Sequence, residues 1–178
     1  MTKTKQLALS ALLVAMALGL SCLERFIPLQ LLIPLPGVKL GLANIVTMMA
    51  LYFLGGKISF SVLVVRCLLG SVFGGGVTGL AMSLTGGLFA FATMVPAKKL
   101  PYLSIYGVSI LGAAAHNLGQ VCAAAALLHS GYTFAYLPFL LLLSIPSGLL
   151  TGTISAAAFR TLRSVFPTAV TSSSNGMQ

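Results

Sequence analysis

Residues 103–128, LSIYGVSILGAAAHNLGQVCAAAALL, decide the fold class because they form a long apolar run without a charged side chain. An α-helix needs about 20 predominantly apolar residues to cross the hydrocarbon core of a bilayer. The run is long enough, and its densest polar group consists of the near neighbours His116, Asn117 and Gln120. It therefore predicts a transmembrane helix that carries polar side chains inside the membrane.

The rest of the chain repeats this apolar pattern, with glycine and proline clusters as turn signals between the runs. We predict one all-α integral membrane domain over residues 1–165, a six-helix transmembrane bundle. Its spans cover residues 7–23, 38–54, 58–73, 77–95, 103–128 and 134–159. The second and third spans are short, so each could instead be half of a hairpin buried among its neighbours. Residues 166–178 are polar and are expected to form a disordered cytoplasmic tail.

The composition excludes an ordinary soluble domain. Hydrophobic residues make up 58% of the chain and charged residues only 6%, whereas about a quarter of the residues in a soluble domain are charged. Asp is absent and Glu24 is the only acidic residue. Chemistry that needs paired carboxylates or carboxylate-held magnesium is therefore excluded for this chain alone. We expect no nucleic-acid binding, because the ten basic residues form no stripe with interleaved aromatic residues.

The basic residues predict the orientation, because Lys and Arg are enriched in cytoplasmic loops. If the N-terminus is cytoplasmic, only Arg25 and Lys39 lie at the outer surface. We therefore expect both termini in the cytoplasm. The three prolines within residues 26–36 prevent a continuous helix, so this segment is expected to lie at the interface or to cover the bundle. The basic residues on the inner side are then Lys3, Lys5, Lys57, Lys98, Lys99, Arg160 and Arg163.

A basic, hydrogen-bonding pocket is predicted in the middle and outer half of the bundle. Arg66 follows Lys57 by nine residues, which places it about 13 Å from the inner boundary, where a permanent charge is costly. Two interpretations stay open: Arg66 bonds helix carbonyls or snorkels, or it binds the negative group of a ligand. We expect no metal or cofactor, since His129 lies at a helix end without other ligands nearby. The candidate substrate-binding residues are Lys39, Asn44, Arg66, His116, Asn117 and Gln120.

One face of the first span carries small residues. Ala11, Ala15 and Gly19 recur at four-residue spacing, which allows another helix to approach closely. This face either packs within the bundle or docks a partner membrane subunit. The chain has no Gly-x-x-x-x-Gly-Lys-Ser/Thr loop, so ATP hydrolysis by that phosphate cradle would require a partner.

Four stretches carry a family resemblance: GVKLGLANIVT at 37–47, RCLLG at 66–70, SLTGG at 83–87 and GAAAHNLGQ at 112–120. They resemble the Gx transporter family, whose members are often labelled heptaprenyl diphosphate synthase component I. The resemblance implies a polytopic protein of the bacterial cytoplasmic (inner) membrane, similar to the six-helix substrate-binding S components of energy-coupling-factor transporters. Those components rely on a transmembrane coupling subunit and two ATPases, and ALLVA at 11–15 resembles their docking patch.

The leading hypothesis is a non-catalytic, S-component-like subunit that captures a small anionic or amphiphilic substrate from the outside, and a prenyl-type ligand is included among the candidates. The alternative is a non-catalytic membrane subunit of a polyprenyl (heptaprenyl) diphosphate synthase in isoprenoid or quinone biosynthesis. Such synthases hold magnesium with aspartate-rich motifs, which a chain without Asp cannot supply. A structural bundle or passive channel is a third possibility.

Overall fold

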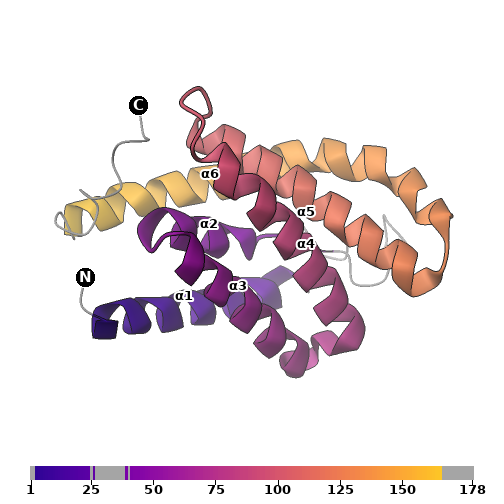
Figure 1. Cartoon of the computed structure of the whole chain (residues 1–178), viewed down its shortest axis with the longest axis horizontal. Coiled ribbons are helices and arrows are strands. Elements are labelled where there is room, and N and C mark those ends of the chain that lie inside the picture. The colour runs from indigo at the N-terminus through magenta and orange to yellow at the C-terminus, as the bar shows by residue number, and fades with distance from the viewer. Residues whose placement is uncertain (1–2, 25, 27–38, 40, 166–178) are drawn as a thin grey trace.

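The computed structural model describes residues 3–24, 26, 39 and 41–165, and their regular secondary structure is helical (Figure 1). The turn η2 at Ser71–Gly75 joins α3 to α4, and the 3-10 helix η3 at Gly131–Tyr136 precedes α6. Nearly all of the proline-rich segment and the whole predicted tail fall outside the described residues. The α-helices within the described ranges are α1 Lys3–Glu24, α2 Asn44–Phe53, α3 Gly56–Gly70, α4 Gly76–Ala97, α5 Ile105–Leu128 and α6 Leu137–Val165.

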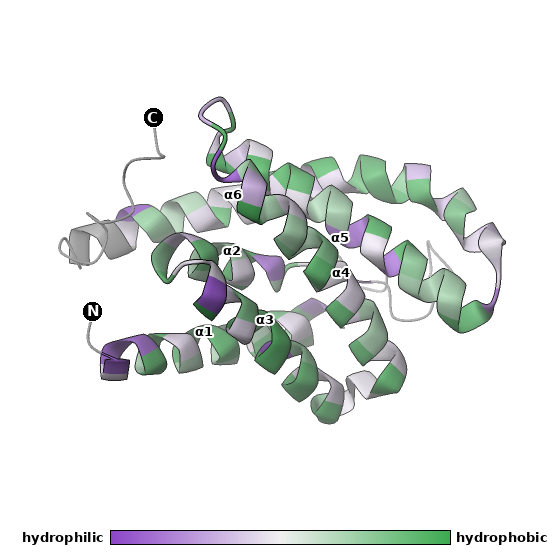
Figure 2. Ribbon diagram, viewed as in Figure 1, coloured by the Kyte–Doolittle hydropathy of each residue, from purple (hydrophilic) through white to green (hydrophobic). Residues whose placement is uncertain are grey.

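Four segments of the described chain are long and apolar enough to cross a membrane, which identifies an integral membrane protein. They are Lys3–Glu24, Gly56–Ala97, Ile105–Leu128 and Gly131–Thr161. Hydrophobic residues predominate along the ribbons of these helices (Figure 2), and many of their large apolar side chains, such as Leu12, Phe60 and Leu142, are exposed. The segment Gly56–Ala97 contains two helices, because the backbone at Phe73 and Gly74 is not helical. Gly74 and Gly76 have φ angles of +104° and +60°, which glycine adopts without steric cost.

The helix α2 is the buried centre of the bundle and is much shorter than the predicted span 38–54. Nine of its ten residues are buried. At a rise of about 1.5 Å per residue, ten residues cover about 15 Å, roughly half of the apolar core of a bilayer. The regular helix is preceded by Gly41 at a φ of +81°, which is incompatible with a right-handed helix. The N-terminus of α2 therefore lies inside the bundle.

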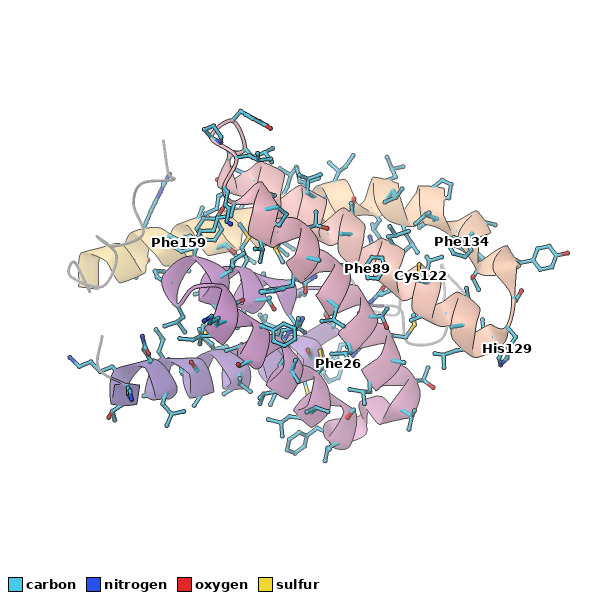
Figure 3. The ribbon with its side chains drawn as sticks, viewed as in Figure 1. Phe26, Phe89, Cys122, His129, Phe134 and Phe159 are labelled. Atoms are coloured by element: carbon cyan, nitrogen blue, oxygen red, sulfur yellow. The ribbon has the colours of Figure 1, made fainter. Side chains whose placement is uncertain are left out.

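Contacts with α4 and α6 hold the other end of α2. The Nζ atom of Lys98 donates to the carbonyl oxygen of Leu51 at 3.0 Å and lies 4.5 Å from the centre of the Tyr52 ring. A cation at this position stabilises the carbonyl end of a helix. Tyr52 and Phe53 also pack against Phe159 of α6, with ring centres 5.2 and 4.6 Å apart (Figure 3).

The helices α4 and α5 pack backbone against backbone, because glycines lie at their crossing. A methyl group added at Gly119 would lie 2.7 Å from the carbonyl oxygen of Thr85 and 2.8 Å from the Cα atom of Gly86. One added at Gly86 would lie 2.8 Å from Nδ1 of His116. Small residues thus allow the close approach of the two helices. They also leave the space in which the imidazole of His116 rests against α4.

We expect Gly119→Ala to lower the melting temperature of the detergent-solubilised protein, because its methyl group would collide with backbone atoms of α4 that cannot rotate away. Overpacking of this kind costs about 1–3 kcal/mol. The matched control is Gly79→Ala on α4, where an added methyl group meets nothing within 4 Å. The control should leave the melting temperature unchanged or raise it, since Ala favours helix formation over Gly. Equal melting temperatures for the two variants would contradict the tight crossing.

Candidate functional site

Five of the six predicted binding residues meet around the N-terminus of α2, between α3, α4 and α5. We call this group the polar cluster. Four of its members are buried side chains and Lys39 is half-buried. The residues come from three separate parts of the chain, around positions 39–44, 66 and 116–120, so the cluster exists only in the folded protein. Its members are Lys39, Asn44, Arg66, His116 and Gln120.

Arg66 extends from α3 and is the buried cation of the cluster, with 5% of its surface exposed. Its Nη2 atom donates to Oδ1 of Asn44, the first residue of α2, at 3.1 Å. Its Nε atom is buried and has no hydrogen-bond partner among the residues described. A methyl group at Gly87 would lie 3.3 Å from Nη2, so a glycine on α4 leaves room for the guanidinium. A buried guanidinium with an unused donor can bind an anion.

His116 and Gln120 lie one turn apart on α5 and share a hydrogen bond. In the orientation that satisfies its neighbours, the Gln120 carboxamide oxygen accepts from Nε2 of His116 at 3.0 Å and from the N–H of Lys39 at 3.2 Å. Its nitrogen donates to the carbonyl oxygen of Lys39 at 3.2 Å. Because Nε2 then carries the proton, Nδ1 of His116 is an acceptor. No hydrogen-bond partner for Nδ1 occurs in the described part of the chain.

Lys39 and residues 41–43 form a turn that covers the polar cluster, and we call them the covering turn. The main chain of Lys39 bonds to Gln120, and its Nζ atom donates to Oγ of Ser83 on α4 at 3.3 Å. A methyl group at Gly41 would lie 3.0 Å from Nδ2 of Asn44 and 3.0 Å from Cδ2 of His116. Only a residue without a side chain allows this contact. The covering turn therefore closes the cluster on one side.

Glu24 belongs to the same region, although the sequence patterns did not assign it to the site. It ends α1 and is only 6% exposed. Its Oε1 atom accepts the N–H of Leu42 at 2.5 Å, and the carboxylate also bonds the backbone of Gly41. The positive charges of Lys39 and Arg66 act on this carboxyl group. Since α2 has no side-chain cap of its own, Glu24 supplies a hydrogen-bond acceptor beside its N-terminus. The available signal was its status as the only acid in the chain.

Asn117, the sixth predicted residue, faces another direction. Its Nδ2 atom donates to the carbonyl oxygen of Leu140 in α6 at 2.7 Å. Adjacent helix positions differ by about 100°, so Asn117 faces α6 while His116 faces α4. His129 lies at the end of α5, away from the cluster (Figure 3). Across the described ranges, no three His, Cys or acidic side chains gather in a way that could hold a metal ion.

An open groove of about 720 Å³ lies between α1 and α3. Ala11 and Ala15, two of the three predicted docking residues, line this groove, whereas Gly19 does not. The groove walls include apolar side chains such as Leu18 and Val65, with Lys3 at one end. Small side chains on α1 keep the groove open, as at surfaces where membrane helices approach closely.

The comparison with known families covers most of the chain. A family model described as heptaprenyl diphosphate synthase component I matches residues 13–158. The matched region contains the whole polar cluster as well as Glu24. No curated protein and no solved structure shows significant similarity to the chain.

We expect Glu24→Ala to loosen the covering turn, because the N–H groups of Gly41 and Leu42 lose their acceptor. Loss of a helix cap costs about 1–2 kcal/mol, which raises the equilibrium constant for opening of the covering turn by a factor of about 5–30. Hydrogen exchange followed by mass spectrometry should show faster exchange in peptides that contain these amides, with unchanged exchange in α5.

The control for this experiment is Ser10→Ala, also on α1, whose hydroxyl bonds only the carbonyl oxygen of Gln6 in its own helix. It should leave exchange in the covering turn unchanged. Faster exchange throughout α4 and α5 in Glu24→Ala would contradict the local role, since it would mean that Glu24 supports the whole fold.

Proposed function

The chain belongs to the heptaprenyl diphosphate synthase component I family, and from this premise we propose that it is the substrate-binding component of a membrane transporter. It captures a small anionic or amphiphilic substrate in the polar cluster. Partner subunits supply ATP hydrolysis, and the chain itself is not an enzyme. The observation that carries the proposal is the buried Arg66 guanidinium, which lies beside the N-terminus of α2 with its Nε donor unused.

The electrostatics of the cluster favour an anionic ligand. Arg66 and Lys39 carry positive charges, and both act on His116 at the centre of the cluster. The N-terminus of α2 adds the positive end of a helix dipole. Helices that begin inside the membrane bind negative substrate groups in this way in secondary transporters. Gln120 and Asn44 add hydrogen-bonding groups that can orient the ligand.

The covering turn supports capture of a substrate rather than passive conduction. Hydrogen bonds between this turn and Gln120, Ser83 and Glu24 hold it against the cluster, with Ser83 and Glu24 as acceptors. Few bonds would have to break to admit a ligand, and they could re-form around it. The absence of Asp from the chain argues against catalysis, because magnesium-dependent prenyl chemistry needs several carboxylates.

We further propose an S-component-like bundle of six helical segments in the bacterial cytoplasmic membrane, with both termini in the cytoplasm. The start of α1 and the end of α6 lie on the same side of the molecule (Figure 1), in agreement with this topology. The half-length α2 would then form part of the second crossing.

The coupling partner is proposed to be a membrane subunit that inserts a helix into the groove between α1 and α3. Ala11 and Ala15 form its small-residue lining, and Gly19 belongs to the same small-residue face of α1. Close approach of two helices at such small residues is a common mode of association in membranes.

The second candidate is a non-catalytic membrane subunit of a polyprenyl diphosphate synthase, and the description of the matching family favours it. In this role the chain would anchor a soluble, aspartate-rich synthase at the membrane and hold a prenyl-type ligand. The two candidates differ in the partners that they require, so isolation of the native complex separates them.

We expect native mass spectrometry of the mildly extracted protein to detect a bound anionic small molecule. Arg66→Gln should reduce the occupied fraction at least about tenfold, because charge-assisted bonds of this kind contribute about 1.5–3 kcal/mol. Arg160→Gln removes the same charge from an exposed position on α6 and should retain the ligand. An empty wild-type protein, or equal occupancy in both variants, would argue against the proposed site.

We expect the tagged protein, extracted from its native membrane, to co-purify with a large membrane subunit and ATPases. The double variant Ala11→Leu and Ala15→Leu should lose these partners, because leucine side chains would fill the groove. Ala8→Leu, an exposed position of α1 outside the groove lining, is the matched control and should retain them. Recovery of a soluble synthase in place of ATPases would favour the second candidate.

A further inference from the structure

We infer that the groove between α1 and α3 binds one anionic phospholipid, with an acyl chain between the two helices and the phosphate beside Lys3. The inference goes beyond the proposed function, because it concerns the chain before a partner subunit has docked on it. Three observations support it: the length of the groove, the distribution of polar side chains along it and the position of the only acidic residue of the chain.

The groove is long and open, and its length suits a lipid of one leaflet. Its volume of about 720 Å³ lies within the range of about 300–1,000 Å³ that is typical of small-molecule sites. The lining residues of α1 extend from Lys3 to Leu18, which is about 22 Å along the helix axis. The hydrocarbon core of a bilayer is about 30 Å thick. Because α1 is a membrane-spanning segment, the groove runs from one membrane boundary past the middle of the bilayer.

Polar side chains line only one end of the groove. On α1 they are Lys3, Gln6 and Ser10, and on α3 the polar lining residue is Ser61, near the start of that helix. A methyl group added at Gly70, the last residue of α3, would lie 3.8 Å from the side chain of Leu18, so the two helices run in the same direction and their starts form one end. The lining residues farther along are Ala11, Val14, Ala15, Leu18, Val62, Val65 and Leu69.

This division into a polar end and an apolar length is the division of a phospholipid. The polar end lies where α1 enters the membrane, which is the depth of the head groups, and the apolar length lies at the depth of the acyl chains. Basic sites between membrane helices bind anionic lipid head groups in this way. With the cytoplasmic N-terminus proposed above, the lipid belongs to the inner leaflet.

Lys3 favours an anionic head group over a zwitterionic one. Its side chain is exposed at the mouth of the groove. Glu24 is the only acidic residue of the chain and ends α1, about 30 Å farther along the helix axis. No acidic side chain of this protein can therefore neutralise Lys3, whereas a lipid phosphate can. A zwitterionic lipid brings a second cation to the same place, which weakens the attraction. The carboxamide of Gln6 can donate to the oxygens of the head group.

The lipid and a partner helix require the same space. The coupling subunit is proposed to dock at Ala11 and Ala15, which line the apolar part of the groove. The bound lipid must therefore leave when the partner docks, and it covers the apolar walls until then.

The test uses the purified full chain in detergent, titrated with dioleoyl phosphatidylglycerol or dioleoyl phosphatidylcholine, which have the same acyl chains. Native mass spectrometry gives the dissociation constant of the first bound lipid. Wild-type protein should bind phosphatidylglycerol about fivefold more tightly, which is the effect of about one Lys beside an anionic group. Lys3→Gln should abolish this preference. Lys5→Gln is the matched control, because it removes the same charge from an exposed position of α1 that does not line the groove, and it should keep the preference.

The double variant Ala11→Leu and Ala15→Leu tests the apolar part of the site. It should lose the tight first binding step for both lipids, because the leucine side chains take the space of the acyl chain. Ala8→Leu, outside the groove lining, should leave both dissociation constants unchanged.

Equal binding of the two lipids by wild-type protein would overturn the inference. An equal loss of preference in Lys3→Gln and Lys5→Gln would also overturn it, because the attraction would then come from the basic start of the chain as a whole. Unchanged lipid binding in the double leucine variant would place the lipid elsewhere and reject the site. If that variant loses the partner subunits while the wild-type groove binds no lipid, the occupant is a helix of the partner. This result rejects the lipid and leaves the proposed function intact.

Discussion

The interior of this protein is arranged around one buried cation, whose charge must be compensated by neighbouring polar groups. Arg66 lies on a membrane-spanning segment with 5% of its surface exposed, and a charge at such a position is costly unless other groups surround it. The chain has a single acid to offer, so dipoles must provide most of the compensation. The side-chain oxygen of Asn44 accepts a hydrogen bond directly from Arg66, and Asn44 is the first residue of a helix that begins inside the bundle.

That helix, α2, creates a second requirement, because a helix N-terminus inside the bundle exposes unpaired N–H groups. Glu24 meets it from the end of α1 by accepting the N–H of Leu42. The same bond holds the covering turn, whose Lys39 backbone pairs with Gln120 on α5. A continuous set of polar contacts thus links α1, α2, α3 and α5 around one point, and the glycines of α4 leave the space for it.

This arrangement is polar and basic and is covered on one side, but not all of its buried hydrogen-bonding atoms have partners among the described residues. The Nε atom of Arg66 and Nδ1 of His116 have no partners in the part of the chain that the structure describes, which is rare for buried polar groups. Both functional candidates use this feature, one to capture a transported substrate and the other to hold a lipid precursor for a synthase. They differ in what docks on the outer faces of the chain, such as the groove beside Ala11 and Ala15.

Hydropathy predicted most of the helices because crossing a bilayer is a requirement on each segment separately. Glycine-rich turns such as residues 74–76 could also be predicted from the sequence, since a positive φ angle depends on the residue type at that position. The polar residues of the interior could also be identified, because His116 and Arg66 stand out in apolar runs. The second span was already short, but the residue at which α2 begins could not be predicted from hydropathy, because residues 38–43 are as apolar as the helix that follows.

The sequence alone determined that the protein lies in a lipid bilayer. It also determined the approximate positions of the helices and the polar residues that the interior must accommodate. The tertiary structure alone decided which of those residues meet. It turned Asn117 toward Leu140 and His116 toward α4, although they are neighbours in the chain. It also brought Glu24 to Leu42 and to the field of Arg66. The physical reason is that hydropathy and helical period act within one segment, whereas hydrogen bonds and charge compensation act between segments that only folding brings together.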